Sequence, residues 1–323
     1  YILNLIDRKL PFILVEPIRK DLGLNDTQIG LLTGAMFMLI YCTSSLPVAK
    51  IADKYSRKWV LVASVTVWSL MTSAGGLAAN FWQLGLARAG VAIGESGCMP
   101  ASHSMLADIF PRRRRATVAA VFMAGAPIGM LLGLAGGGII NDLFDWRTAM
   151  LIIGAPGLLV ALLIALTIRE PGRRAVRDDT VKTGVWPAMK VLFSKPTFRH
   201  IAIASVLSSL AGAAAQSFGP AFVMRTWGRA NTETGIKYGL LVGVGGIIGA
   251  LLGGFVNDKM QSRDRRWGLG FVAAVVALSG PVQVFAWQAT TFPIFVLLMF
   301  IPQISFMIGS GPIISSVQTL AGI

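Results

Sequence analysis

Two opposite charges lie inside an otherwise apolar stretch of the chain, the segment LARAGVAIGESGC at 86–98. Arg88 and Glu95 are seven residues apart, which is almost two turns of an α-helix, so both point to one face, roughly 10 Å apart along the axis. Because neither charge is tolerated cheaply in hydrocarbon, this face must line a protein interior or a wet cavity. There the carboxylate could carry a proton, and the arginine could offer planar donors to a phosphate or carboxylate.

More charges lie in the first apolar segment, within the stretch LIDRKL. Asp7 and Arg8 are adjacent, with Lys9 after them, so the first two diverge by about 100° and cannot both look straight into one cavity. Together with Arg88 and Glu95 they could form a fixed buried network that sets helix packing, or a site where charge moves. Intramembrane ionisable residues are retained mostly where they work, which favours the second interpretation. Four uncharged residues are candidates to line the same cavity: Asn4, Tyr41, Gln216 and Gln303.

The elements that must position these residues are membrane-spanning helices. The chain is 54% hydrophobic and only 14% charged, whereas soluble domains carry about 25% charged residues. Runs of about 20 apolar residues predict an all-α membrane protein with ten spans. These are expected at 1–15, 30–51, 59–80, 82–108, 116–140, 148–168, 200–224, 236–257, 267–288 and 291–316.

The net charge of +14 is distributed in a way that argues against a nucleic-acid partner. The connections 50–58, 111–115, 169–199 and 258–266 hold 20 lysines and arginines, whereas the connections that alternate with them hold six. Positive residues accumulate on the cytoplasmic side of membrane proteins, so these four connections are predicted to be cytoplasmic.

The long polar connection 169–199 predicts a linker between a bundle at 1–168 and a second bundle at 200–323. An internal repeat supports this division, because AKIADKYSRK and GGFVNDKMQSRDRR both place a small residue four positions before an aspartate and a basic cluster after it. A duplicated bundle is the arrangement of many secondary transporters.

The loop AKIADKYSRK resembles the cytoplasmic loop signature of the major facilitator superfamily, although Ala49 and Ser56 stand where that signature prefers glycine. FDWRTAMLIIGAPGLL resembles the Trp-Arg opening of the superfamily's sixth helix. Four stretches are similar to the Spinster family of lysolipid and sphingolipid transporters, while the anion:cation symporter branch shares the general signatures. The four are LIDRKL, ADKYSRKWVLVAS, ARAGVAIGESGCMPASHSMLADIF and RRRRATVAAVFMAGAPIGMLLG.

This resemblance implies a fold of two pseudo-symmetric six-helix bundles, with the second incomplete at helices seven to ten and the sequence part of a longer chain. It implies that Arg8 and Glu95 face the transport cavity and that Asp7 helps to switch states. It also implies a cytoplasmic latch formed by Asp53, Arg57, Asp108, Arg115 and Asp258. Alternatively, these residues serve only membrane topology, and this alternative is favoured for the arginines at 112–115.

We therefore expect a proton-coupled secondary transporter of an amphipathic anionic lipid, with Glu95 and Asp7 carrying protons and Arg8 and Arg88 binding the headgroup. A transporter of a small organic anion or drug, or a transporter-like membrane receptor, are the alternatives. No nucleophile and base pair, metal-ligand spacing or phosphate-binding glycine loop points to an enzyme, a metal or a cofactor. We expect a monomer in the bacterial inner membrane.

Two packing expectations follow. Glu95 should lie within reach of the first helix near Arg8, with Arg88 nearer the extracellular end. The four-residue spacing of Gly125, Gly129 and Gly133 predicts a close helix contact.

Overall fold

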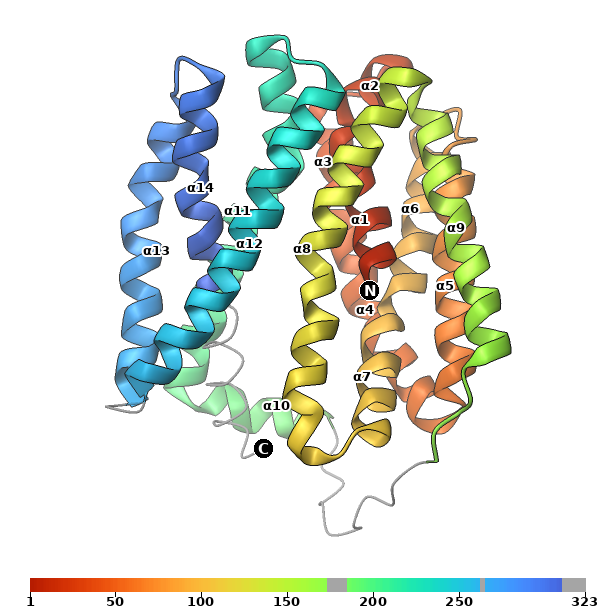
Figure 1. The fold of residues 1–323 in the computed structure, drawn as a ribbon, viewed down its shortest axis with the longest axis vertical. Coiled ribbons are helices and arrows are strands. Elements are labelled where there is room, and N and C mark those ends of the chain that lie inside the picture. The colour runs from red at the N-terminus through yellow and green to blue at the C-terminus, as the bar shows by residue number, and fades with distance from the viewer. Residues whose placement is uncertain (173–184, 262–264, 310–323) are drawn as a thin grey trace. The chain divides into compact units, whose positions relative to one another are not determined.

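The computed structural model describes residues 1–172, 185–261 and 265–309, and for 112, 113, 116, 185–188, 257, 258, 261 and 265–269 it describes the backbone alone. Within these ranges every regular element is helical, so the predicted all-α fold is confirmed (Figure 1). The elements are α1 (Ile2–Ile13), α2 (Val15–Asp21), α3 (Asp26–Gly30), the π-helical segment η1 (Leu31–Ala35), α4 (Met36–Lys54), α5 (Arg57–Gly75), α6 (Phe81–Ser96), α7 (Cys98–Ile109), α8 (Arg112–Leu143), α9 (Trp146–Thr167), α10 (Val185–Ser194), α11 (Pro196–Trp227), α12 (Asn231–Gln261), α13 (Arg265–Trp287) and α14 (Phe292–Ile308).

Six of the described helical stretches are long and apolar enough to cross a membrane. They are Asp26–Lys54, Thr117–Leu143, Trp146–Thr167, Pro196–Trp227, Asn231–Val256 and Gly270–Trp287. The other predicted spans correspond to α1, α5, the pair α6 and α7, and the apolar but shorter α14.

The chain divides into two compact units. Unit 1 comprises Tyr1–Arg174 and Gln216–Gly239, and unit 2 comprises Ala175–Ala215 and Leu240–Ile323. The helices α11 and α12 therefore each contribute to both units. The expected division into bundles at 1–168 and 200–323 stays a prediction.

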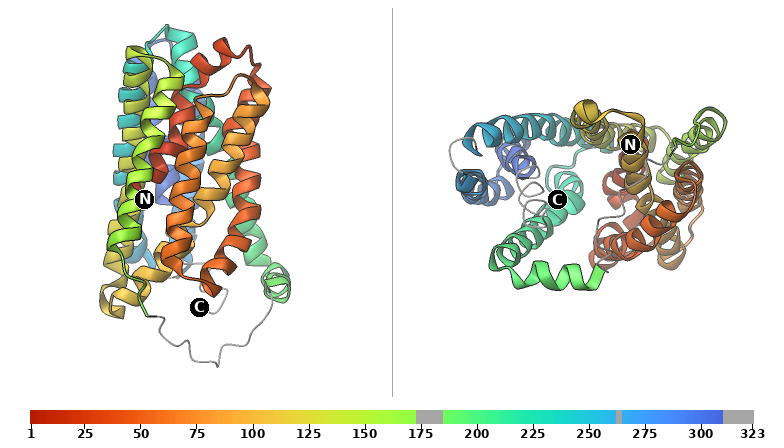
Figure 2. Two further views of the ribbon diagram at one scale, coloured as in Figure 1. Left: turned by 90° about the vertical axis from the view of Figure 1, so that its right-hand side faces the viewer. Right: turned by 90° about the horizontal axis from the view of Figure 1, so that it is seen from below.

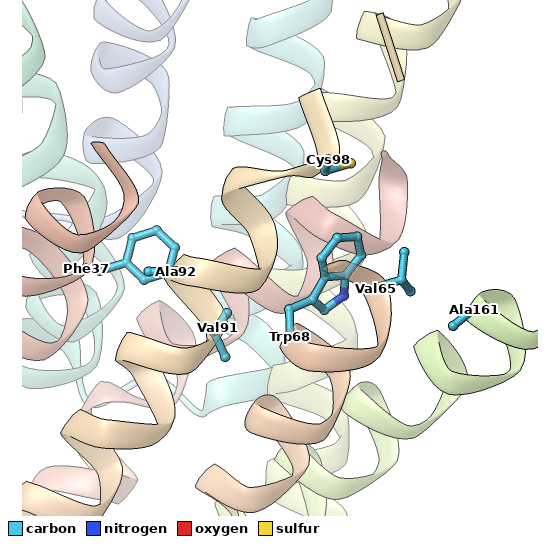
Figure 3. Packing of buried hydrophobic residues seen from close by; sticks show 7 residues of the cluster. All are labelled: Phe37, Val65, Trp68, Val91, Ala92, Cys98 and Ala161. Atoms are coloured by element: carbon cyan, nitrogen blue, oxygen red, sulfur yellow. The ribbon is translucent and has the colours of Figure 1, made fainter. Parts of the chain in front are cut away.

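In unit 1, α5 packs against α6 and α9, α4 packs against α6, and α1 packs against α8. Figure 2 shows the long helices of this unit running along nearly the same direction. Its buried core joins α4, α5, α6, α7 and α9, with Trp68 at its centre (Figure 3). The cluster consists of Phe37, Val65, Trp68, Val91, Ala92, Cys98 and Ala161.

Glycines let α1 and α8 approach one another to backbone contact. A Cβ atom on Gly133 would lie 2.8 Å from the carbonyl oxygen of Ile6, and one on Gly129 would lie 2.5 Å from that of Ile2. A Cβ on Gly125 would lie 3.1 Å from the Ile2 side chain. The predicted close contact is confirmed. It fixes the position of α1, and of its charged residues, along the length of α8.

The predicted fourth span, 82–108, is not one helix. It breaks at Gly97, between α6 and α7. Pro100 lacks the N–H that would bond the carbonyl of Ser96, so the regular ladder cannot continue through this point. Gly94 packs against the α5 backbone, where an added Cβ would lie 2.7 Å from the backbone nitrogen of Trp68. Glu95 is thus held at the end of α6, directly before the break.

Several other boundaries differ from the sequence-based expectation. The first span ends at Ile13 and is followed by the separate helix α2, and the second span is preceded by α3 and η1. The helix α8 begins at Arg112, so the basic run 112–115 forms its first turn instead of a loop. The connection 169–199 contains a helix of its own, α10, which lies crosswise to the α11 that follows it (Figure 2).

In unit 2, α13 packs against α14, and α12 contacts α14 through glycines. A Cβ on Gly253 would lie 2.7 Å from the carbonyl oxygen of Ile308. Close glycine contacts therefore occur in this unit as well as between α1 and α8.

Candidate functional site

The site is built on α1, whose three consecutive ionisable residues each meet a different neighbour. Successive helical residues point about 100° apart, so Asp7, Arg8 and Lys9 cannot share one direction. Arg8 reaches α6 and α4, Lys9 reaches α11, and Asp7 faces α5. One turn of α1 therefore places ionisable side chains against α4, α5, α6 and α11.

Arg8 and Glu95 form an ion pair. Both Nε and Nη2 of Arg8 lie 2.6 Å from Oε2 of Glu95, whose side chain is completely buried. The arginine side chain remains 18% exposed, and its guanidinium lies 4.6 Å from the ring centre of Tyr41 and 5.5 Å from that of Phe37. The expected proximity of Glu95 to Arg8 is therefore confirmed. The second carboxylate oxygen, Oε1, has no hydrogen-bond partner among the described residues.

Arg88 is buried on the same helix as Glu95, nearer to the start of α6 at Phe81. Its guanidinium lies 4.5 Å from the ring centre of Phe37, and its Nε and Nη2 atoms have no hydrogen-bond partner in the described part of the chain. It also borders a small cavity of about 10 Å³, which has room for about one water molecule. The cavity is lined by Pro11, Val15, Ile18, Ile29, Leu32, Thr33, Leu84, Arg88 and Met150.

Asp7 is almost completely buried, and its polar neighbours on α5 are Thr72 and Trp68. Its Oδ1 atom has no hydrogen-bond partner within the described ranges. Asn4 lies one turn earlier on α1, next to Glu95, and is also buried. Both residues therefore belong to the same polar cluster as the ion pair.

Lys9 makes a polar contact with an uncharged group. Its Nζ donates a hydrogen bond of 2.5 Å to Oε1 of Gln216 on α11, and it lies 4.6 Å from the ring centre of Phe12. The predicted cavity residue Gln216 is thus part of the cluster, as is Tyr41. Gln303 lies on α14 in unit 2, where its side chain packs against Gly245.

A second polar cluster surrounds Arg57 at the start of α5. Its guanidinium donates to Asp108 at 2.5 Å, to Glu170 at 3.0 Å and to Ser104 at 2.9 Å. Glu170, which follows the end of α9, also accepts from the Ser56 hydroxyl and from the backbone N–H of Lys58. Burial alone would raise the pKa of Glu170, but these hydrogen bonds outweigh it and lower the pKa to about 2.

The remaining predicted latch residues are Asp53, Arg115 and Asp258. Asp53 is exposed near the end of α4. Arg115 donates from Nε to the carbonyl of Phe110 at 3.3 Å. The side chain of Asp258 lies outside the described residues. The structure therefore joins Arg57 to Asp108, and the latch role stays a prediction.

A third cluster ties the end of α11 to the rest of unit 1. Arg225 donates to Glu16 on α2 at 2.5 Å and to both carboxylate oxygens of Asp26 on α3 at 2.9 and 2.6 Å. Nearby in the chain, the backbone N–H of Thr232 at the start of α12 donates to Asp142 of α8 at 2.7 Å.

Sequence reasoning missed several members of these clusters. Phe37 precedes Tyr41 by one helical turn, and this aromatic spacing in the second span could have indicated it. Glu170 is an acidic residue at the start of a mainly basic connection, which could have marked it as a partner for Arg57. Nothing in the sequence pairs Arg225 with Glu16 and Asp26, because their sequence separation is about two hundred residues.

The described residues contain no group of histidines, cysteines and carboxylates that could hold a metal ion. What the α1 cluster offers is a buried carboxylate that can bind a proton and cations that can bind an anion in a place of low dielectric. The Glu95 carboxylate and an anionic ligand can therefore compete for Arg8, and a proton on Glu95 would release the arginine.

Comparisons with known proteins agree with this architecture. The family model described as "Major Facilitator Superfamily" matches residues 1–322. The chain is 36% identical to an MFS-type efflux pump of Mycolicibacterium smegmatis, over 98% of this chain and 74% of the pump. It is 26% identical to Protein spinster homolog 1 of Rattus norvegicus over 82% of this chain, but it spans only about half (54%) of that relative's length.

The fold is also similar to that of a solved crystal structure. A bacterial homolog to the human lysosomal transporter Spinster, in an inward-facing and unoccupied conformation, superposes with a TM-score of 0.87 at 30% identity. The match covers 100% of this chain and 75% of that one.

Proposed function

Since the chain belongs to the Major Facilitator Superfamily of membrane transporters, we propose that it is a proton-coupled secondary transporter of an amphipathic anion, with a lysophospholipid or sphingolipid-like molecule as substrate. It would work by alternating access in the bacterial inner membrane, with 50–58, 111–115, 169–199 and 258–266 on the cytoplasmic side.

The ion pair between Arg8 and Glu95 is the observation that carries this proposal. While the carboxylate is ionised, it occupies the guanidinium. A proton bound to Glu95 removes that negative charge and leaves Arg8 free to hold an anionic headgroup. Proton and substrate binding are then coupled through one residue, and Asp7 provides a second buried carboxylate on the same helix.

The surroundings of Arg8 support an amphipathic ligand. Phe37 and Tyr41 place aromatic rings against the guanidinium, so the polar site has apolar walls that suit the start of an acyl chain. The resemblance to the Spinster family of lysolipid and sphingolipid transporters also supports a lipid as the substrate.

Uptake of a fluorescent lysophospholipid into proteoliposomes tests the proposal. With the parent protein, we expect flux to increase when a pH gradient is imposed across the membrane. In a Glu95→Gln variant, flux should no longer respond to the gradient. A Glu233→Gln variant, which removes a partly exposed carboxylate near the start of α12, should behave like the parent. Gradient-driven flux that survives in Glu95→Gln rules out the coupling role.

The 36% identity to an MFS-type efflux pump favours a second candidate, a transporter of small amphipathic drugs. A cationic or neutral dye that is carried as fast as the lysophospholipid would support it. Saturable binding without any flux in the same liposomes would instead indicate a receptor.

A further inference from the structure

The helix α10 (Val185–Ser194) lies at the start of a membrane-spanning stretch. Only Lys195 separates it from α11, whose stretch Pro196–Trp227 is long and apolar enough to cross a membrane. Both α10 and the first part of α11 belong to unit 2, and α10 lies crosswise to α11 (Figure 2). A helix that is crosswise to a spanning helix at its very beginning runs along the plane of the membrane.

One face of α10 is apolar and exposed. Met189, Leu192 and Phe193 are spaced by three and four residues, so they share one side of the helix. Met189 is 40% exposed and Phe193 is 46% exposed, although contact of such side chains with water is unfavourable. Lys190 and Ser194 lie one turn apart on another side. Separate apolar and polar faces are typical of helices that lie in a membrane interface.

An aromatic contact stabilises the corner between α10 and α11. The rings of Phe193 and Phe198 meet edge to face, with their centres 5.1 Å apart. Farther along, α11 exposes large apolar side chains that suit contact with lipid acyl chains. These are Ile203, Val206, Leu207 and Leu210. The corner therefore lies at the boundary between acyl chains and water, where α10 can insert its apolar face.

The residues around this corner are basic. From 181 to 200 the sequence contains four lysines and arginines and no aspartate or glutamate. Lys190 on α10 and Arg199 in the first turn of α11 are both exposed. They belong to the connection 169–199, which is predicted to be cytoplasmic. Anionic phospholipids of a cytoplasmic leaflet attract lysines and arginines near the membrane surface, so the corner and the leaflet are complementary in charge.

We propose that α10 is an interfacial helix that binds anionic phospholipids of the cytoplasmic leaflet. Its apolar face, with Met189 and Phe193, enters the upper acyl region, while Lys190 and Arg199 contact headgroup phosphates. This contact anchors the connection 169–199 on the membrane. The surface is separate from the proposed transport site around Arg8, and the proposal does not depend on the transported substrate.

A fluorophore on either side of α10 tests the insertion. An NBD label is attached to Met189→Cys or Val191→Cys in the full chain, with Cys42 and Cys98 replaced, in nanodiscs that contain phosphatidylglycerol. Val191 is 59% exposed but lies about 200° around the helix from Met189, so it is the matched control.

Doxyl-labelled lipids should quench the label at position 189 several times more strongly than the label at position 191, and aqueous iodide should show the opposite order. Equal quenching at both positions overturns the proposal. So does a label at position 189 that neither quencher reaches, because protein then covers this face.

Photocrosslinking tests the charge recognition and needs no introduced cysteine, so it remains decisive if the labelled variants do not fold. Photoactivatable phosphatidylglycerol should label the peptide that contains α10 more than photoactivatable phosphatidylcholine does. Lys190→Gln and Arg199→Gln should each reduce this preference on the order of fivefold, the factor expected for one basic residue at an anionic surface.

Lys20→Gln is the matched control, because it removes one exposed positive charge from α2. It should keep the parent's preference for phosphatidylglycerol. Equal labelling by the two lipids in the parent overturns the proposal, as does a preference that is unchanged in both Lys190→Gln and Arg199→Gln.

Discussion

At the scale of single residues, the first helix separates three adjacent ionisable groups into three environments. Asp7 meets the hydroxyl and indole of α5, Arg8 meets a carboxylate and two rings, and Lys9 meets an amide. The helical rotation of about 100° per residue makes this separation unavoidable. Each group can therefore serve a different step, such as proton binding or headgroup binding, although all three lie on one turn.

The shape of the Arg8 side chain should matter as much as its charge. An Arg8→Lys variant keeps the positive charge but loses the planar fork that contacts Glu95 with two nitrogens. We expect the affinity for dodecyl phosphate to fall on the order of tenfold, and further in Arg8→Ala. Isothermal titration of the three proteins checks this. If Arg8→Ala binds as tightly as the parent does, the headgroup is held elsewhere.

The sequence could predict the contact between Arg8 and Glu95 because charges within apolar helices have few acceptable partners. It could not predict which atom of the cluster stays unpaired. That outcome depends on the rotation of α1 against α6 and α11, which is set by glycine contacts with α8 that fix the position of α1. The neutral partner of Lys9 therefore became visible only in the structure.

At the scale of elements, the seam between α1 and α8 depends on the missing side chains of its glycines. In Gly133→Ala, the new Cβ would lie 2.8 Å from the Ile6 carbonyl oxygen and 3.0 Å from the Ile6 Cα, so the helices must move apart. In the matched variant Gly136→Ala, nothing lies within 4 Å of the new Cβ. Both changes alter the intrinsic helix propensity of α8 equally.

We expect Gly133→Ala to lower the thermal unfolding temperature in detergent by several degrees, while Gly136→Ala leaves it unchanged or slightly higher. Differential scanning fluorimetry of the two variants and the parent provides the comparison. Equal melting temperatures for both variants would show that α1 is not held by this seam.

The Glu170 cluster holds the segment after α9 against the start of α5. Its pKa of about 2 lies below the ordinary value of 4.5, so its hydrogen bonds stabilise the fold fully above about pH 4.5. This contribution should be lost as the pH falls from about 4.5 to about 2. The parent should therefore melt at a lower temperature at pH 3 than at pH 6. The Glu170→Gln variant should have a lower melting temperature than the parent at pH 6, and its melting temperature should change less between pH 6 and pH 3. An identical pH response in both proteins contradicts the assignment.

At the scale of the whole molecule, the sequence predicted the all-helical membrane fold, since long apolar runs and basic connections are read directly from composition. It did not predict that residues 216–239 are grouped with the first unit. This grouping depends on pairs such as Arg225 with Glu16 and Asp26, which no local pattern encodes. If the two predicted bundles move as bodies during transport, these contacts must break whenever the site opens on their side of the membrane.

Arg225 is therefore expected to influence the equilibrium between the states that open to opposite sides of the membrane. An Arg225→Met variant removes the ion pairs to α2 and α3 but keeps a long side chain at the end of α11. Arg229→Met is the comparison variant, because it removes an arginine from the same connection whose ion pair is to Glu233, only four residues away. A cysteine at Ser217, which is buried on α11, reports the opening in a background where Cys42 and Cys98 are replaced.

Labelling of Ser217→Cys by a membrane-impermeant thiol reagent measures this balance. The reagent is added on the side where the connection between α11 and α12 lies. Loss of Arg225 should stabilise the state open to that side relative to the closed one, so labelling should become several times faster, whereas Arg229→Met should label at the parent rate. Neither arginine substitution alters the proposed site around Arg8 and Glu95, so lipid binding should be retained in both variants. Unchanged labelling in Arg225→Met would mean that this cluster only supports the fold of unit 1, and that the barrier to opening on this side lies in other contacts.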